Sequence, residues 1–430
     1  MGKSFLLLLI VVSIFYSCAK SQEYTGFKVS GRHLYDNCGE MVILRGISNP
    51  NIWFERTGNT HFKEIEKTGA NVVRIVWQSN GSPSDLDKAI TNCIDLNMIP
   101  MIELHDATGD WSKLQQCVNY WLRDDVVDVI RKHESYLLVN IANEAGDYNV
   151  TGSTFKNTYI NAITSLRNAG IRVPLIIDAT DWGKNINILQ SQGPAIVEAD
   201  PEHNVMFSIH MWWPKMYGYT EQSIVNEIQE SVKMGLPLIV GEFSQMHGEC
   251  NDNFINDNNS IAYKTIIREC QKNQVGYIAW SWFGNCNSLW DMSTSGTFES
   301  LYDWGLEVAV TDENSIKNTS VRPYSIVNGK CNPQSSDAKV FKDTKVASLN
   351  INPNYSTKEF NINFSLDKEQ KVELCIFNSQ GKKVYTLINS LQKKGYHAFI
   401  YNALELPAGI YFCRLSAHGF NETLKMVVLK

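Results

Sequence analysis

The stretch LLVNIANE, at residues 137–144, is a near-continuous apolar run that ends on Asn143 and Glu144. Further along the chain, LPLIVGEF at residues 236–243 has the same form and carries Glu242 near its end. Apolar runs of this length are typical of parallel strands that are buried on both faces. An ionisable group at the end of such a strand costs free energy unless it is hydrogen-bonded or functional. The two stretches therefore predict a parallel sheet in which two strands each present a glutamate.

Six more runs of this kind flank these two, and all of them alternate with amphipathic helical stretches. The runs cover residues 42–48, 71–77, 98–105, 137–144, 174–179, 205–210, 236–243 and 275–282. Helical patterns lie between them, for example at residues 60–68, 84–97 and 154–168. Eight successive βα units predict a (β/α)8 TIM barrel, an α/β fold, with a doubly wound open sheet as the alternative. A hairpin at residues 27–34, turning through 36–39, is expected to close the barrel floor.

Composition divides the chain into four parts. Residues 1–22 have the pattern of an export signal, because Lys3 precedes an apolar run that is too short to span a membrane. The barrel domain is expected at 23–331, and a polar linker at 332–348. Residues 349–430 predict a small all-β sandwich of short alternating strands. Those strands are expected at 360–366, 371–377, 395–402, 409–417 and 423–429.

The 430 residues carry a net charge of −6, which argues against nucleic acid or an anionic membrane as a partner. Ten cysteines in an exported chain permit disulfides. The candidate pairs are Cys93–Cys117 and Cys250–Cys286. Because the signal segment contains Cys18, its removal leaves at least one thiol unpaired within the chain. The cysteines and histidines show no metal-ligand spacing, so neither a metal nor another cofactor is expected.

Polar side chains stand on or after six of the eight expected strands, whose carboxyl ends meet at one face of a barrel. In chain order they are Arg74, His105, Asn143 with Glu144, His210, Glu242 and Trp280. Two glutamates across a barrel mouth suit cleavage of a glycosidic bond, one as a protonated acid and the other as an ionised nucleophile. On the fourth and seventh strands they are expected about 5–5.5 Å apart, which is the retaining geometry. Arg74 is expected to keep one of the carboxylates ionised.

Taken together, these segments resemble glycoside hydrolase family 5, the cellulase and β-mannanase group, over residues 27–330. The similarity lies in VNIANE (139–144), IVGEF (239–243), VRI (73–75), LHD (104–106), SIHM (208–211) and AWSW (279–282). The resemblance implies that Glu144 is the acid/base and Glu242 the nucleophile. The residues that it places in the cleavage subsite are Arg74, His105, Asn143, His210 and Trp280.

Within that family the bacterial β-mannanases are most similar, through ATG at 107–109 and DATDWG at 178–183. The chain departs from the family at Trp212, because a tyrosine that bonds the nucleophile usually stands two residues after His210. An indole donates a hydrogen bond but cannot accept one, so the nucleophile is expected to be held differently here. Trp212 is counted among the substrate-binding residues. At least one of four tryptophans is expected to be a platform for a sugar ring: Trp182, Trp212, Trp213 and Trp282.

The C-terminal residues resemble a second module, the sorting domain of the type IX secretion system of Bacteroidetes. The similarity lies in NPN (352–354), IFNSQGKKV (376–384), LPAGIY (406–411) and a basic C-terminal end (425–430). The resemblance implies passage through the periplasm to the cell surface or the medium, with the secretion machinery as a partner.

The expected function is that of a secreted retaining endo-β-1,4-glycanase, a monomer that hydrolyses β-mannan or glucomannan by double displacement. A cellulase of the same family, acting on β-1,4-glucan, is the alternative substrate assignment. A non-catalytic carbohydrate-binding protein is the alternative from another class, and the intact pair of Glu144 and Glu242 argues against it. A metal-dependent hydrolase or an aldolase would need a ligand cluster or a strand-end lysine, and the sequence shows neither.

Overall fold

The computed structural model describes residues 24–250, 252 and 254–331, and then 347–352, 355–356, 359–366, 368–393, 395–404, 406–417 and 420–429. The expected export signal at 1–22 and most of the expected linker at 332–348 lie outside the described residues. Within the described part of the chain, no helix is both long and apolar enough to cross a membrane.

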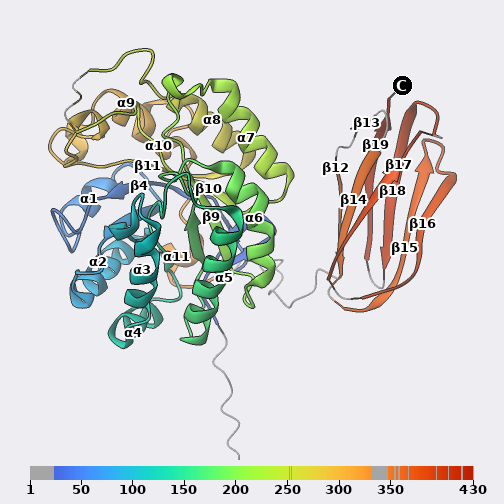
Figure 1. The fold of residues 1–430 in the computed structure, drawn as a ribbon, viewed down its shortest axis with the longest axis horizontal. Helices are drawn as coiled ribbons and strands as arrows, with labels where there is room; N and C mark the ends of the chain where they lie inside the picture. The colour runs from blue at the N-terminus through green and yellow to red at the C-terminus, as the bar shows by residue number, and fades with distance from the viewer. Residues whose placement is uncertain are drawn as a thin grey trace, which may run out of the picture.

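The larger domain is a closed barrel of parallel strands surrounded by helices (Figure 1). The order around the barrel is β10-β11-β4-β5-β6-β7-β8-β9, and the pairing of β11 with β4 closes the ring. The strands are β4 (Arg45–Asn49), β5 (Val72–Trp77), β6 (Ile99–Leu104), β7 (Leu138–Asn140), β8 (Leu175–Asp178), β9 (Val205–His210), β10 (Leu238–Glu242) and β11 (Gly276–Ala279). The expected TIM barrel is therefore confirmed, and the open sheet is excluded.

Some of the helices begin where the sequence supplies a capping group. The side chain of Ser82 accepts a hydrogen bond from the backbone of Asp85 at the start of α2, and Thr220 forms a capping box with Ser223 at the start of α7. The helices are α1 (His61–Glu66), α2 (Pro83–Asp95), α3 (Leu114–Trp121), α4 (Asp124–Lys132), α5 (Gly152–Asn168), α6 (Ile186–Ala199), α7 (Glu221–Lys233), α8 (Tyr263–Asn273), α9 (Asp303–Leu306), α10 (Ile316–Thr319) and α11 (Tyr324–Asn328).

A small antiparallel sheet closes the floor of the barrel, as expected. It consists of β1 (Lys28–Ser30), β2 (His33–Tyr35) and β3 (Met41–Val42). Phe27 and Leu34 pack there against apolar side chains of every barrel strand except β4, among them Val72, Leu138 and Ile239. The prediction of one continuous strand at 42–48 is wrong. Val42 pairs with Leu34 in this small sheet, and the barrel strand begins only at Arg45. The chain changes from antiparallel to parallel partners between these two points.

Two disulfides tie distant parts of the barrel domain together. The expected pair Cys250–Cys286 is present, and Cys38–Cys331 joins the floor hairpin to the last described residue of the barrel domain. The expected pair of Cys93 and Cys117 is wrong, since both are free thiols. These two cysteines lie on α2 and α3 and are fully buried among apolar side chains, where they serve as small core residues.

Removing the Cys38–Cys331 disulfide should destabilise the barrel by about 2–5 kcal/mol. The two cysteines are separated by 293 residues, so the bond closes a loop that spans the whole barrel and restricts its unfolded state. Thermal and urea unfolding of the Cys38→Ser/Cys331→Ser variant would measure this. The Cys250→Ser/Cys286→Ser variant is the matched control, and a smaller loss is expected from its separation of 36 residues. Equal losses in the two variants would contradict the loop-length argument.

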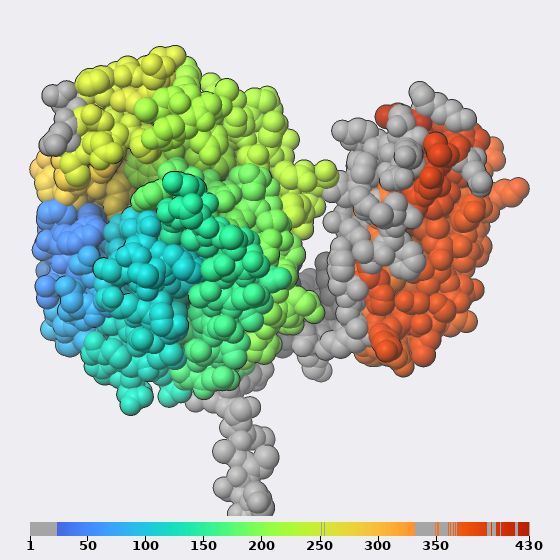
Figure 2. Space-filling model, viewed as in Figure 1, coloured from blue at the N-terminus to red at the C-terminus, as the bar shows by residue number. Residues whose placement is uncertain are grey.

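The C-terminal domain, whose described residues are orange to red in Figure 2, consists of two β-sheets that share one apolar core. One sheet has the order β12-β14-β17 and the other β13-β19-β18-β15-β16. The strands are β12 (Ala347–Asn352), β13 (Tyr355–Ser356), β14 (Glu359–Leu366), β15 (Gln370–Asn378), β16 (Lys383–Gln392), β17 (Gly395–Asn402), β18 (Gly409–Ala417) and β19 (Phe420–Val428). The five expected strands are all present. Three more were missed: β12, which begins inside the expected linker, the short β13, and β16, whose side chains are mostly exposed.

Candidate active site

A cleft of about 560 Å³ opens at the mouth of the barrel, where the strands end. It is lined by His105, Thr108, Glu144, Trp182, Lys184, Trp212, Tyr217, Glu242, His247, Gly248, Glu249, Trp280 and Trp290. Five of the eight residues expected in the site are in this lining. The other three are fully buried and contact residues of the lining: Arg74, Asn143 and His210. All eight expected residues are thus brought together at one end of the barrel.

Glu242 is the last residue of β10, and both oxygens of its carboxylate accept hydrogen bonds. Its Oε1 accepts a hydrogen bond from Arg74 at 2.6 Å, and its Oε2 accepts one from the indole N–H of Trp212 at 3.2 Å. Arg74 lies on β5 and is buried, so little water screens this ion pair. Gly241 leaves space for the side chain of Ser208, because a Cβ at this position would lie 2.0 Å from Oγ of Ser208. Both the expected arginine contact and a donor from the unusual Trp212 are therefore present.

Glu144 follows β7 with a left-handed backbone, at φ 46°. Its backbone N–H donates to Asp178 at 3.1 Å, and its Oε1 lies 2.8 Å from Nδ1 of His210. Burial, together with the negative charge of Glu242, raises the pKa of Glu144. A raised pKa keeps the proton on this carboxyl group to higher pH, which is what a general acid needs.

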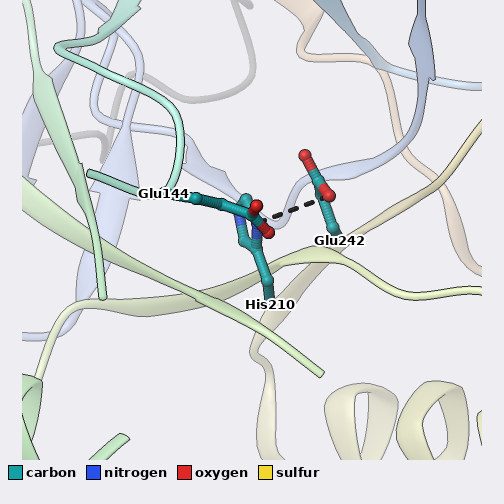
Figure 3. Close-up of side chains that lie close together, drawn as sticks. All are labelled: Glu144, His210 and Glu242. Carbon is teal, nitrogen blue, oxygen red and sulfur yellow. Dashed lines mark hydrogen bonds and ion pairs between the residues drawn. The ribbon is translucent and has the colours of Figure 1, made fainter. Parts of the chain in front are cut away.

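The two glutamates face each other beside His210 (Figure 3). One carboxylate oxygen of Glu144, one of Glu242 and one ring nitrogen of His210 all lie within 4.8 Å of one another. Retaining glycosidases hold their two carboxyl groups about 5–5.5 Å apart, whereas inverting ones need about 6.5–9.5 Å to admit a water. The spacing here therefore favours direct attack by a carboxylate.

The same three groups lie close enough together to hold a metal ion. Burial alone would lower the pKa of His210, but the charges of Glu242 and Asp178 raise it to about 10. A protonated imidazole has no free lone pair, and both oxygens of Glu242 already accept hydrogen bonds. The chemistry of this donor set favours an acid–base pair over a metal site.

Two further buried carboxylates belong to the site and were missed from the sequence. Glu103 on β6 accepts a hydrogen bond from Nδ1 of His105 at 2.9 Å, and Asp178 at the end of β8 lies 3.4 Å from Nε2 of His210. Both carboxylates also lie within 3.8 Å of Arg74. A charged residue inside or at the end of an otherwise apolar run is the signal that would have found them. They make the site strongly acidic beneath the two glutamates.

His105 and Trp280 form one stacked side of the cleft. Their rings lie 5.4 Å apart at 20°, and Trp53 meets the edge of His105 at 5.2 Å. Asn143 lies below them, accepts a hydrogen bond from Arg74 at 2.6 Å and donates one to Thr108 at 2.8 Å. The expected subsite residues are therefore arranged as one connected network around the arginine.

The four tryptophans considered as sugar platforms divide into two pairs. Trp182 and Trp212 line the cleft, and Trp182 is 40% exposed with Lys184 above its ring. Trp213 and Trp282 are buried, and each donates its indole N–H to a backbone carbonyl. Only the first pair is available to a ligand. Several loop residues of the cleft were not predicted from the sequence: Lys184, Tyr217, Glu249 and Trp290.

The fold is a (β/α)8 barrel, and two glutamates face each other in an open cleft at its mouth. This is the architecture of a barrel glycoside hydrolase. Residues 35–285 match the family model described as Cellulase (glycosyl hydrolase family 5), and the chain belongs to that family. Because it belongs to this family, the chain is a glycoside hydrolase, as predicted from the sequence.

Three known proteins illustrate the relationship. A mannan endo-1,4-beta-mannosidase of Cellvibrio japonicus is 33% identical over 325 residues, which are 72% of this chain and 71% of that protein. A protein with the same description from Salipaludibacillus agaradhaerens is 32% identical over 307 residues, covering 69% and 94% of the two chains. The mannohexaose complex of Thermomonospora fusca beta-mannanase has a TM-score of 0.61 at 32% identity, covering 69% of this chain and 98% of that one.

The C-terminal domain matches a second family model. Residues 350–429 match the Secretion system C-terminal sorting domain, which includes nearly all of the two β-sheets. The expected sorting module is confirmed by this match. The chain is accordingly exported to the cell surface or the extracellular space, with secretion machinery as a partner and a polysaccharide as its substrate.

Proposed function

We propose that the chain is an extracellular retaining endo-β-1,4-mannanase, with Glu242 as nucleophile and Glu144 as acid/base. The observation that carries the mechanism is the pair of carboxyl groups whose oxygens lie within 4.8 Å across the cleft. The substrate rests on three relatives of about one-third identity, two described as mannan endo-1,4-beta-mannosidases and one as a beta-mannanase in complex with mannohexaose.

In the first step a carboxylate oxygen of Glu242 attacks the anomeric carbon from the face opposite the leaving group. Glu144 gives its proton to the glycosidic oxygen as that bond breaks, and a glycosyl ester forms on Glu242. In the second step the ionised Glu144 takes a proton from water, whose oxygen attacks the same carbon and releases Glu242. Two inversions leave the anomeric configuration unchanged.

The surrounding residues prepare the two carboxyl groups for opposite roles. Arg74 and Trp212 donate hydrogen bonds to the carboxylate of Glu242 and hold it in place for attack. The buried position of Glu144 near Glu242 favours its protonated form before the attack. Once Glu242 becomes an ester it is neutral, and the repulsion that raised the pKa of Glu144 falls, which suits its second role as a base.

Two of the remaining residues contact the sugar in this proposal, with Trp280 as the floor of the cleavage subsite and His105 as a hydrogen-bonding partner of a sugar hydroxyl group. Asn143 is buried behind the cleft and acts on the sugar through His105 and Thr108, which its amide nitrogen contacts. Trp212 is placed next to both the nucleophile and the cleft. One barrel supplies all eight residues of the proposed site, so a monomer is sufficient for the proposed reaction.

Release of reducing sugar from unsubstituted β-mannan, glucomannan and carboxymethyl cellulose tests the substrate assignment. We expect activity on the two mannans and little on the glucan. Activity confined to carboxymethyl cellulose would keep the mechanism but replace mannan by β-1,4-glucan as the substrate. If the full chain released nothing from any polymer yet bound them, the protein would be a carbohydrate-binding protein instead.

A further inference from the structure

Two tryptophans from different loops meet in the wall of the cleft next to the nucleophile. Trp212 follows β9, and Trp290 ends the short 3-10 turn η4 (Ser288–Trp290) that follows β11. Their rings lie 5.8 Å apart at 63°, an edge-to-face arrangement, and both line the cleft. Trp290 therefore contacts a side chain that donates a hydrogen bond to Oε2 of Glu242, an oxygen that also lies 3.4 Å from Nδ1 of His210.

The hydrogen bond from Trp212 to Glu242 depends on where the indole ring is held. An indole has a single N–H donor that lies in the ring plane, so the donor cannot rotate independently as a hydroxyl does. The N–O distance of 3.2 Å is already at the long end for an N–H···O bond. A small tilt of the ring would therefore break it. Whatever packs against the ring of Trp212 controls this contact.

Trp290 is well placed for that task, because its turn is anchored to the loop that follows the nucleophile strand. Gln245 donates to the carbonyl of Leu289 at 2.7 Å, and Asn287 donates to the carbonyl of Glu249 at 2.8 Å. The disulfide between Cys250 and Cys286 joins the same two loops. The turn is thus fixed relative to β10, the strand that ends in Glu242.

We propose that Trp290 is a positioning residue for the nucleophile. It acts through Trp212: its ring holds the indole of Trp212 at the angle at which the N–H reaches Oε2 of Glu242. The inference rests on the proposed function, because it assigns a role in double displacement. It differs from a direct role in binding substrate, since a residue that only stacks on a sugar would change KM and leave the nucleophile undisturbed.

The test uses four variants of the full chain on β-mannan: Trp290→Ala, Trp290→Phe, Trp212→Phe and the double variant Trp290→Ala/Trp212→Phe. Trp212→Phe keeps the ring but removes the N–H donor. We expect Trp290→Ala and Trp212→Phe each to lower kcat about 10-fold with little change in KM. The double variant should be no worse than either single one, because both remove the same hydrogen bond. Trp290→Phe should recover much of the activity, since it keeps a ring against Trp212.

Ser288→Ala is the matched control in the same turn, and it should retain wild-type kinetics, because Ser288 is exposed and no side-chain contact of it enters the argument. A rise in KM with kcat unchanged in Trp290→Ala, or additive losses in the double variant, would overturn the proposal. Melting temperatures of all variants would show whether a loss of activity is caused by unfolding. An inactive wild type would instead count against the proposed function, so the two failures are distinguishable.

Discussion

Replacing Glu242 by alanine should lower kcat on β-mannan about 10⁵-fold, because the carboxylate that forms the covalent intermediate is lost. The fold should survive, since Arg74 keeps other buried partners, with Asn143 at 2.6 Å and Asp178 at 3.6 Å. Reducing-sugar release and circular dichroism of the full chain would measure the two properties. Glu299→Ala serves as control, because this glutamate is exposed and outside the cleft.

Chemical rescue makes this prediction specific to a nucleophile. With dinitrophenyl β-mannobioside as substrate, azide should enter the space left by the Glu242 carboxylate and attack the anomeric carbon from that face. The dinitrophenolate leaves from the opposite face, so the product should be the α-linked glycosyl azide. A β-linked azide, or a variant that retains normal activity on mannan, would show that Glu242 is not the nucleophile.

Replacing Glu144 by alanine should lower kcat on β-mannan about 10²–10⁴-fold, the usual contribution of a general acid. On dinitrophenyl β-mannobioside the first step should be nearly unaffected, because dinitrophenolate leaves without protonation. The glycosyl ester on Glu242 should then accumulate, since no base activates water. Azide should accelerate its breakdown and yield the β-linked glycosyl azide. Equal losses on mannan and on the activated substrate would contradict the role of Glu144 as acid.

The pH dependence follows from the direction of the pKa shift at Glu144. Burial and the charge of Glu242 raise its pKa above the ordinary glutamic acid value of 4.5. The first step needs the protonated form, so the rate should stay high below this raised pKa and fall as the pH rises through it. Measured on mannan, this basic limb should be present in the wild type and absent in Glu144→Gln, which has no carboxyl group to titrate. A basic limb that persists unchanged in that variant would assign it to another group.

The excess of carboxylates explains why the pKa of Glu144 is raised. Glu144, Glu242, Glu103 and Asp178 are all buried around Arg74, the single arginine of the group. One arginine cannot balance four negative charges, so protons are retained on Glu144 and on the two histidines of the site. Arg74 contacts Glu242 directly, which leaves Glu144 as the carboxyl group that stays protonated.

Much of this was predictable because burial pattern and residue type are local properties of the chain. The apolar run at 137–144 and seven others like it determine a parallel barrel, since strands buried on both faces need no alternation. A barrel then brings the carboxyl ends of β5, β6, β7, β9, β10 and β11 to one mouth. Seven of the eight expected site residues therefore followed from position alone, and Trp212 was added through the resemblance to family 5.

Contacts between segments far apart in the chain could not be predicted, because they depend on the three-dimensional fold. Cys93 and Cys117 lie on consecutive helices yet remain unpaired, whereas Cys38 finds its partner 293 residues away. The spacing of the cysteines in the sequence predicts neither outcome, because a disulfide forms only where the fold brings two Cα atoms close together.

At the nucleophile, too, some features could be predicted from the sequence and others could not. The amino-acid pattern alone shows that Glu242 ends a buried strand and that an indole, which can only donate, stands two residues after His210. The contact of the Trp212 indole with Oε2 of Glu242, and the packing of Trp290 against its ring, are visible only in the folded protein. Strand ends are predictable because the regular geometry of the barrel places them. Ring orientations in the loops depend instead on long-range packing, here between the segments that follow β9, β10 and β11.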